Sequence, residues 1–488
     1  MATLTGETFE SLNPATGAVV GTYPVHTAEE VEAAVAKARA AAQWWASLGF
    51  AGRAERLARW RGALAQRMSE LGEVITAETG KPAGDAQLEL VLAIEHLAWA
   101  AKHARKVLGP QRRAPGLLLS NQAASVEYHP LGVVGVIGPW NYPVYTPLGS
   151  ISYALAAGNA VVFKPSEYTP GVGKWLVESF AEAAPEHPVL QLVTGFGETG
   201  AALTRAGVDK LAFTGSAATG KKVMATAAET LTPVVIEAGG KDPLLVDADA
   251  DLDAAADATV WGAFSNAGQT CAGVERVYVH ERVYDAFVAK VVDKAERIEA
   301  GEHYGPMTMP SQLDVVRRHI EDALARGGRA LVGGNGAVGE RFVRPTVLVD
   351  VPEDCSAVRE ETFGPTVTIA KVADMDEAIE KANDSPYGLG STVFSKSRGM
   401  ELARRLRTGQ TAINAPLSFA GIASLPFGGS GESGFGRIHG PEGLREFARP
   451  KAIARQRFTA PIALTSFARS KKTEALVGKL VAKLHGKS

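Results

Sequence analysis

Cysteine is nearly absent from this chain of 488 residues, which contains only Cys271 and Cys355. So few thiols exclude a disulfide framework, and the expected compartment is a reducing cytoplasm. Cys355 lies in a polar segment with no basic neighbour before Arg359, and we expect it to be inert. Cys271 follows a Gly-containing turn after a helix-like stretch, so it is the candidate nucleophile, with a buried structural cysteine as the alternative.

The chain also lacks long apolar runs and an excess of charge of one sign. No apolar stretch approaches the roughly 18 residues of a membrane span. Residues 1–13 contain no basic region followed by an apolar run, so we expect no secretory signal. The net charge of -2 gives no overall field that would attract nucleic acid. With 46% hydrophobic and 21% charged residues, the composition is that of a globular protein of about two or three packed lobes.

The order of strand-like and helical segments predicts an α/β protein. Residues 28–107 have helical spacing, whereas Val133–Ile137 and Ala160–Phe163 are short apolar strands that alternate with helices. A second alternating set extends from residue 243 to residue 413. Continuous Val/Ile strands between helices indicate parallel sheets covered on both faces. We therefore expect two doubly wound, Rossmann-like lobes; the alternative is one large α/β domain with insertions.

Two glycine-containing segments are candidates for binding a dinucleotide. Residues 195–200 form a GxGxxG pattern, but Lys210 begins the next expected strand and no helix is expected to open directly, so a tight connecting loop is the alternative. Gly215 and Ser216 end a strand and should open a helix through Val223. Free N–H groups at that helix N-terminus would attract a pyrophosphate, and Gly215 would let the backbone approach it.

Several motifs occur in one order along the chain. They are Pro139–Pro143, Lys164–Glu167, Phe213–Ser216, Glu237–Lys241, Phe264–Cys271 and Glu360–Pro365. In this order they resemble the aldehyde dehydrogenase superfamily, over about residues 12–451. The resemblance implies an NAD(P)-dependent, hydrolytic oxidoreductase of bacterial type, with two Rossmann-like lobes and a small strand element for oligomerisation.

The resemblance also implies a division of the chain. The dinucleotide-binding domain would comprise residues 1–111 and 131–239, the catalytic domain 240–432, the oligomerisation element 112–130 and 448–458, and a basic amphipathic tail 459–488. An exposed strand edge needs covering, so a homodimer or homotetramer is expected. We expect the tail to dock on a partner subunit or to stay solvated. The alternative is peripheral contact of the tail with an anionic membrane surface.

The implied cofactor is NAD, with NADP as the alternative. The residues that match the family's cofactor site are Lys164, Glu167, Gly197, Gly215, Ser216, Glu361 and Phe363. Lys164 and Glu167 would bind the adenosine ribose, and the carboxylate of Glu167 would repel a 2′-phosphate, which favours NAD. Gly197 would border the adenine, Gly215 and Ser216 would meet the pyrophosphate, and Glu361 and Phe363 would hold the nicotinamide half. No metal site is predicted.

The resemblance assigns the chemistry to three residues. Cys271 would attack the aldehyde to form a thiohemiacetal and then a thioester. Glu237 would activate the water that hydrolyses the thioester and would also deprotonate Cys271; its apolar neighbours should raise its pKa by desolvation. The amide of Asn141 would pair with the backbone N–H of Cys271 to hold the oxyanion. Ile438 stands where many family members carry a second glutamate, which puts a two-glutamate proton relay in doubt.

The predicted substrate is an uncharged aliphatic or aromatic aldehyde. Tyr142 and Phe419 would line the substrate tunnel, and the loop of residues 415–422 offers no arginine or lysine to pair with a substrate carboxylate. A semialdehyde is the alternative. A CoA-acylating dehydrogenase would use the same cysteine without needing Glu237. The remaining alternative is a non-catalytic protein that binds NAD.

Overall fold

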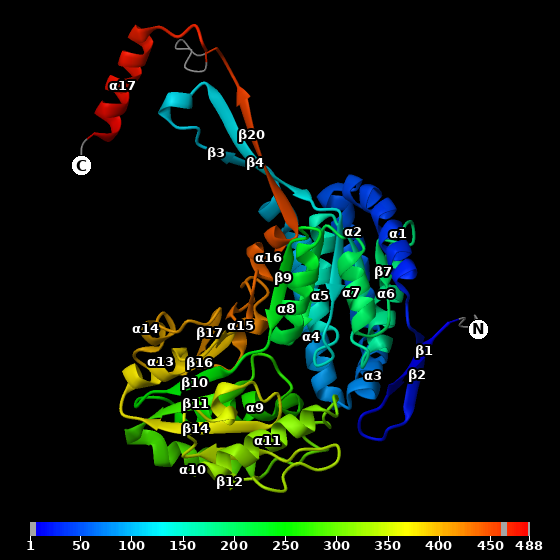
Figure 1. Cartoon of the computed structure of the whole chain (residues 1–488), viewed down its shortest axis with the longest axis vertical. Coiled ribbons are helices and arrows are strands. Elements are labelled where there is room, and N and C mark those ends of the chain that lie inside the picture. Colours follow the sequence, from blue (N-terminus) through cyan, green and yellow to red (C-terminus); the bar gives the residue numbers. More distant parts are fainter. Residues whose placement is uncertain (1–5, 460–465, 487–488) are drawn as a thin grey trace. The chain divides into compact units, whose positions relative to one another are not determined.

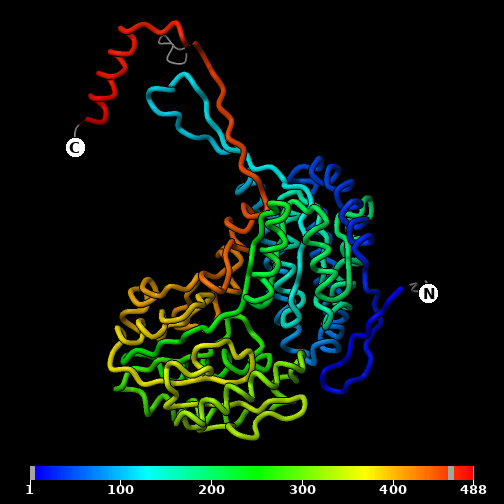
Figure 2. Tube along the Cα trace, in the orientation of Figure 1, coloured from blue at the N-terminus to red at the C-terminus, as the bar shows by residue number. Residues whose placement is uncertain are grey.

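The computed structural model describes residues 6–459 and 466–486. The chain forms two compact units: unit 1 extends to Leu108 and resumes over Pro130–Arg449, and unit 2 comprises Gly109–His129 and the chain from Pro450. Of the predicted tail, residues 460–465 and 487–488 lie outside the described residues. Figure 1 shows the elements of each unit, and Figure 2 traces the same chain as a tube.

The first lobe of unit 1 is built on a six-stranded sheet in the order β19-β9-β8-β5-β6-β7. Its strands are β5 Val133–Ile137, β6 Ala160–Lys164, β7 Leu190–Leu192, β8 Lys210–Gly215, β9 Val234–Ala238 and β19 Gly434–Phe435. The first five pair in parallel, and β19 pairs antiparallel with β9. The buried apolar residues of these strands explain why helices must cover both faces.

One set of helices connects these strands, and a second set precedes β5 along the chain. The connecting helices are α5 Tyr145–Ala157, α6 Pro170–Ala183, α7 Gly197–Arg205 and α8 Ala217–Ala228. The expectation that no helix opens directly after residues 195–200 is wrong, because α7 begins at Gly197. The helical prediction for residues 28–107 is confirmed as α1 Ala28–Ser47, α2 Gly49–Gln66, α3 Met68–Thr79 and α4 Ala83–Leu108. A hairpin of β1 Thr8–Leu12 and β2 Val19–Pro24 precedes them.

The second lobe of unit 1 is built on a seven-stranded sheet in the order β12-β13-β14-β11-β10-β16-β17. Its strands are β10 Asp242–Val246, β11 Val274–His280, β12 Arg329–Val332, β13 Thr346–Val349, β14 Thr366–Val372, β16 Gly390–Phe394 and β17 Gln410–Ile413. The neighbours pair in parallel except β12, which pairs antiparallel with β13. Two mainly parallel, helix-covered sheets confirm the predicted doubly wound α/β class.

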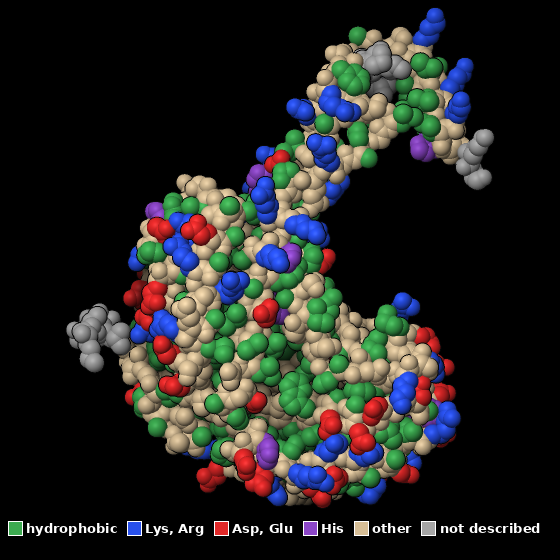
Figure 3. All heavy atoms as spheres, turned by 180° about the vertical axis from the view of Figure 1, so that it is seen from behind, with side chains coloured by type: hydrophobic (Ala, Val, Ile, Leu, Met, Phe, Trp, Pro, Cys, Tyr) green, Lys and Arg blue, Asp and Glu red, His purple; other side chains and the backbone are tan. Residues whose placement is uncertain are grey.

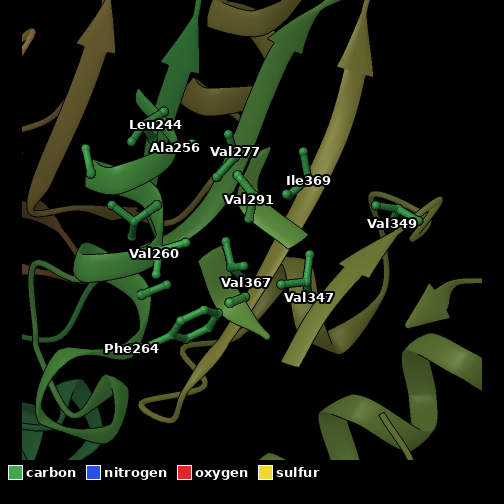
Figure 4. Packing of buried hydrophobic residues seen from close by; sticks show 14 of the residues in the cluster. Leu244, Ala256, Val260, Phe264, Val277, Val291, Val347, Val349, Val367 and Ile369 are labelled. Atoms are coloured by element: carbon green, nitrogen blue, oxygen red, sulfur yellow. The ribbon is translucent and has the colours of Figure 1, made fainter. Parts of the chain in front are cut away.

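Two apolar clusters fix the helices of the second lobe on its sheet. The helices are α9 Leu252–Phe264, α10 Tyr284–Ala295, α11 Gln312–Ala325 and α13 Met375–Asn383. One cluster holds α9, α10 and α11, and the other holds α13. Figure 4 shows Phe264 and Val260 of α9 facing Val277 and Val367 of the sheet. Burying each such side chain stabilises the fold by about 1.5–3 kcal/mol. Because α9 ends at Phe264, this packing also fixes the start of the turn that leads to Cys271.

Unit 2 is a three-stranded sheet followed by a helix. Strand β4 (Gln122–Pro130) lies between β3 (Gln111–Arg113) and β20 (Ala448–Gln456). The guanidinium of Arg457 donates to the carbonyl of Ser120, which fastens the end of β20 to the loop before β4. Helix α17 covers Lys471–His485. The hydrogen bonds of this sheet join β4 to β3 on one side and to β20 on the other. Strands β3 and β20 are therefore its two edges.

Candidate active site

A cavity in unit 1 brings together residues that lie far apart in the sequence. Its wall includes Tyr142 beside α5, Glu237 of β9, Cys271, and Trp261 of α9. Leucines of α4 and of the loop before α15 (Ser418–Gly421) complete a largely apolar surface. Tyr142, Glu237 and Cys271, which the sequence singles out separately, therefore share one cavity.

The turn before Cys271 has a strained backbone. Asn266 and Ala267 have φ values of 51° and 56°, in the left-handed region that costs energy for residues with a Cβ. Gly268 follows at φ 70°, and a Cβ there would lie 2.1 Å from the carbonyl oxygen of Gly364. The side chain of Gln269 holds the turn, because its Nε2 donates to the Asn266 carbonyl at 2.9 Å. The packing of the turn thus sets the position of Cys271.

The carboxyl group of Glu237 is buried without a partner. Its side chain is 3% exposed, and among the described residues neither carboxylate oxygen has a partner at hydrogen-bonding geometry. Burial raises the pKa of Glu237 to about 7, against smaller lowering effects from the Cys271 thiol and the Thr214 hydroxyl. Near neutral pH this carboxyl group can therefore hold or release a proton, whereas an exposed glutamate is almost fully ionised there.

The thiol of Cys271 is held in its protonated form. Cys271 is partly exposed to the cavity, yet protein surrounds it and burial raises its pKa well above the usual range. The negative charge of Glu237 acts in the same direction as the second cause. A thiol with a raised pKa needs a base to become a nucleophile. Of the buried carboxyl groups that raise this pKa, Glu237 has the largest effect.

A buried ion pair holds the loop that carries Asn141. Lys81 and Glu89 are both fully buried, with 2.6 Å between Nζ and Oε2. The ammonium also donates to the backbone carbonyl of Asn141 at 2.8 Å, while Glu89 accepts from the backbone N–H of Val144 at 2.8 Å. The side-chain amide of Asn141 donates to the carbonyl of Gln269 at 2.9 Å. Asn141 therefore lies against the Cys271 turn, although it is not among the residues that line the cavity.

Three residues that line the cavity, Lys81, Asp85 and Glu89, were not predicted from the sequence. All three belong to the segment around the start of α4, which carries no motif and lies more than 50 residues from Asn141. The one sequence signal is an isolated lysine between Gly80 and Pro82. Only the packing of α4 against α5 brings this segment to the site.

Phe419 does not line the cavity. Its side chain is 4% exposed and packs against Phe427 with the ring centroids 6.2 Å apart. The neighbouring residues Leu417, Ser418 and Ala420 line the cavity instead. The difference arises because successive side chains of the short helix α15 point in different directions. The side chain of Phe419 points into the core behind the cavity wall.

A second cavity of unit 1 fits the predicted dinucleotide. It is lined by Lys164, Glu167, Gly197, Gly215 and Ser216. Helices α7 and α8 both begin at this cavity, so their unpaired N–H groups offer the positive end of a helix dipole to a pyrophosphate. A Cβ at Gly215 would lie 2.7 Å from the Phe213 ring, so the position suits glycine.

Lys164 and Glu167 do not neutralise each other. The buried ammonium of Lys164 donates to the carbonyl of Pro165 at 3.0 Å, and burial lowers its pKa. Glu167 accepts from the hydroxyl of Ser166 at 3.2 Å. No ion pair joins the two side chains within the described part of the chain, so both remain available to ribose hydroxyls.

Glu361 and Phe363 lie beside these cavities and are not among the residues that line the dinucleotide cavity. The carboxylate of Glu361 accepts from the backbone N–H of Gly240 at 3.1 Å, and burial raises its pKa to about 8. Phe363 has a left-handed φ of 49°, and its ring meets that of Trp140 edge-on at 5.6 Å. Trp140 lines the dinucleotide cavity, so Phe363 adjoins it through that ring.

Lys241 and Cys355 are two further buried side chains of unit 1. Lys241 is buried and forms an ion pair with Glu275, which also accepts from the backbone of Thr362, so it holds the segment before Phe363. Cys355, expected in a polar connection, is fully buried, and its thiol donates to Asp322 at 3.1 Å. Burial raises the pKa of this thiol as well.

Comparison with known proteins identifies the class. The model of the aldehyde dehydrogenase family matches residues 2–453, so helix α17 lies beyond the matched segment. The chain belongs to this family and is an oxidoreductase that acts on aldehydes. An NAD-dependent aldehyde dehydrogenase from Sinorhizobium meliloti has a similar structure, with a TM-score of 0.89, 34% identity and 93% of each chain covered.

Two relatives carry more particular names. A Mycobacterium tuberculosis protein provisionally named succinate-semialdehyde dehydrogenase (NADP+) 2 is 39% identical over 454 residues, which cover 91% of this chain and 87% of that protein. The 4,4′-diapolycopene aldehyde oxidase of a Methylomonas species is 39% identical over 455 residues, covering 91% and 85%. The named substrates of these two relatives differ greatly in charge and size.

We expect Gly268→Ala to destabilise the protein more than Gly207→Ala does. Both glycines have a left-handed φ, at 70° and 75°, so each alanine should cost about 1–2 kcal/mol through the backbone alone. At Gly207 a Cβ meets nothing within 4 Å, whereas at Gly268 it meets the Gly364 carbonyl. Thermal unfolding of the two variants measures the difference, and equal losses would show that the turn can move away from Gly364.

Proposed function

We propose that this protein oxidises an aldehyde to the carboxylic acid with NAD(P)+ and water. Cys271 is the nucleophile, Glu237 the general base and Asn141 an oxyanion donor. The observation that carries the proposal is the unpartnered, buried carboxyl of Glu237, with a pKa of about 7, on the same cavity as the Cys271 thiol. A base with a pKa near neutral pH, next to a protonated thiol, can accept first the proton of the thiol and later a proton of water.

The first half of the reaction builds a covalent intermediate. The Cys271 thiol gives its proton to Glu237, and Sγ attacks the carbonyl carbon, whose π electrons move to the oxygen. The amide of Asn141 and the backbone N–H of Cys271 stabilise that oxyanion; one such donor contributes about 2.7–4 kcal/mol. Bound NAD or NADP supplies the acceptor for the hydride that leaves the carbon. A thioester on Cys271 remains.

The second half releases the acid. Glu237 first loses the proton that it took from the thiol, which its pKa of about 7 allows near neutral pH. It then accepts a proton from water as the water oxygen attacks the thioester carbon. The carbon–sulfur bond breaks, the acid leaves, and the sulfur of Cys271 takes up a proton. CoA-acylating chemistry would not need this base, so the position of Glu237 favours hydrolysis.

We propose NAD as the preferred cofactor. Glu167 lines the dinucleotide cavity with a carboxylate that forms no ion pair with the described residues. Such a carboxylate accepts hydrogen bonds from a ribose 2′-hydroxyl and repels a 2′-phosphate. The name of the Mycobacterium relative specifies NADP+, and the Sinorhizobium neighbour is called NAD-dependent. Initial rates with each cofactor at equal concentration decide between them.

We propose an uncharged aldehyde as the substrate, against the semialdehyde named for the Mycobacterium relative. Lys81 is the one cation among the described residues that line the cavity, and it is fully buried in its pair with Glu89. Asp85 lines the same wall and would repel a substrate carboxylate. The leucines, Trp261 and Ile438 on this wall suit an apolar chain.

We also propose a cytoplasmic homo-oligomer that pairs through unit 2. The two edge strands β3 and β20 present unpaired backbone groups, and an edge of this kind is stable when another strand covers it. The dimer and the tetramer both satisfy this requirement. No helix of the described residues is long and apolar enough to cross a membrane.

Glu237→Gln should abolish both proton transfers while keeping the shape of the side chain. We expect kcat to fall by at least about 10²-fold and the stoichiometric burst of NADH to disappear. In the unmodified enzyme kcat/KM should rise with pH through about 7, as Glu237 loses its proton, and Glu237→Gln should remove this rise. Stopped-flow NADH absorbance measures both.

Cys355→Ser is the matched control, because it replaces the other thiol and should change neither the burst nor the pH profile. A burst that persists in Glu237→Gln would limit Glu237 to the water step. A rise near pH 7 that persists would assign the ionisation to another group. NADH formation that requires CoA would contradict the hydrolytic reaction.

Asp85→Asn should make the enzyme discriminate less strongly against aldehydes that carry a carboxylate. Removing one negative charge at almost constant volume should raise kcat/KM for succinic semialdehyde about fivefold, while kcat/KM for butanal stays unchanged. Asp285→Asn, at an exposed position of α10, removes the same charge elsewhere and should change neither value. A wild-type enzyme that already prefers succinic semialdehyde would contradict the proposed substrate class.

Lys81 and Glu89 should act through Asn141 and not independently of it. The double substitution Lys81→Met with Glu89→Gln avoids leaving one buried charge unpaired, which would itself be strongly destabilising. We expect this pair variant and Asn141→Ala each to lower kcat by about 10²-fold, and the triple variant to be barely slower than Asn141→Ala. Steady-state kinetics of the three variants give the values of kcat. If the fold-loss of kcat in the triple variant is the product of the other two losses, the ion pair does not work by positioning Asn141.

A further inference from the structure

Positive charge is concentrated in unit 2. Residues 109–129 and 450–488 contain eleven lysines and arginines against two acids, Glu127 and Glu474. This part therefore carries a net charge of about +9 within a chain whose net charge is -2. Figure 3 shows lysine and arginine side chains spread over it, with few acidic ones. The rest of the chain must carry a net negative charge.

Helix α17 combines this charge with an apolar face. At 100° per residue, five aliphatic side chains fall within an arc of about 140°. They are Leu476, Val477, Leu480, Val481 and Leu484. None of the residues of α17 is buried in the structure, and Leu476 and Leu484 are 55% and 43% exposed. The helix is therefore amphipathic, and the described residues leave its apolar face partly or fully exposed.

Lysines follow one edge of that face. Lys472, Lys479 and Lys483 project within about 60° of the first leucine of the arc. None of the three forms an ion pair within the described residues, whereas Arg469 pairs with Glu474 at 3.0 Å just before them. Long lysine stems can lie along an apolar surface while the ammonium groups reach a charged layer beyond it.

A second exposed apolar segment lies in the same unit. The 3-10 turn η1 (Leu117–Leu119) places three consecutive leucines at the surface, with Leu117 65% exposed. Arg112 and Arg113 of β3 precede it. Exposed leucines that lie close in sequence to cations thus occur twice in unit 2.

We propose that unit 2 binds the surface of an anionic lipid membrane, with α17 lying flat at the interface. Exposed leucines would enter the boundary of the acyl chains while lysines meet lipid phosphates. Nucleic acid would match the charge but not the uncovered leucines, because its backbone offers phosphates and no apolar layer. A second copy of the chain could cover the leucines, but it would not require a row of unpaired lysines beside them.

The test uses the full-length protein and vesicles. We expect it to sediment with vesicles of phosphatidylcholine mixed with phosphatidylglycerol, not with vesicles of phosphatidylcholine alone, and to be released by salt. Lys479→Gln with Lys483→Gln should weaken binding by about tenfold or more. Leu476→Gln with Leu484→Gln should do the same. These four side chains are exposed, so turnover of a small soluble aldehyde without vesicles should stay unchanged.

The matched control is Lys37→Gln with Lys396→Gln, which removes two exposed charges from unit 1 and should leave vesicle binding unchanged. Equal loss of binding in this control would mean that total charge and not unit 2 attracts the vesicles, and would overturn the proposal. Wild-type protein that does not bind anionic vesicles would also overturn it. A lower sedimenting mass of Leu476→Gln with Leu484→Gln, without vesicle binding by wild type, would assign the apolar face to a second copy.

Discussion

The removal of Glu237 from water is the constraint on which the proposed chemistry depends. In water a glutamate is a weak base at neutral pH, because it gives up its proton far below pH 7. Burial at the end of β9 raises the pKa of Glu237 to about 7, so the same side chain can hold a proton and release it. That burial requires protein on all sides. Both lobes of unit 1 meet the requirement, since β9 belongs to one sheet and Cys271 follows a helix that packs on the other.

The buried ionisable groups around the site include two closed ion pairs, and also Glu237 and Glu361, which form no ion pair with the described residues. Lys81 with Glu89 and Lys241 with Glu275 are closed ion pairs that also take up backbone hydrogen bonds from the loops beside the cavities. A buried pair of this kind adds little net stability, because the desolvation of both ions offsets their attraction. Its effect is geometric: each pair restricts a loop. Glu237 is left unpaired, and a permanent partner would hold it in one protonation state.

The sequence predicted the class of fold because apolar strands and amphipathic helices have clear periods, and the motif order predicted the family. It did not predict how side chains turn at the ends of these elements. Phe419 and Leu417 are two residues apart, yet one enters the core and the other lines the cavity. The left-handed backbone at Ala267 has no signature in residue type, and at Asn266 the only signal is the general tolerance of asparagine for this region. Lys81 and Glu89 carry no motif, and only the packing of α4 brings them to Asn141.

The net charge of the whole chain does not by itself indicate which partners bind, because salt limits the range over which charges interact. Charges in salt solution interact over about 8–10 Å, a fraction of the width of this protein. A cluster of lysines on α17 therefore presents its own field to a surface, whatever acidic groups lie elsewhere in the chain. The value of -2 is the small difference between two large and separated charges. A partner that approaches one face responds to that face, so the basic unit has to be judged on its own charge and on the leucines beside it.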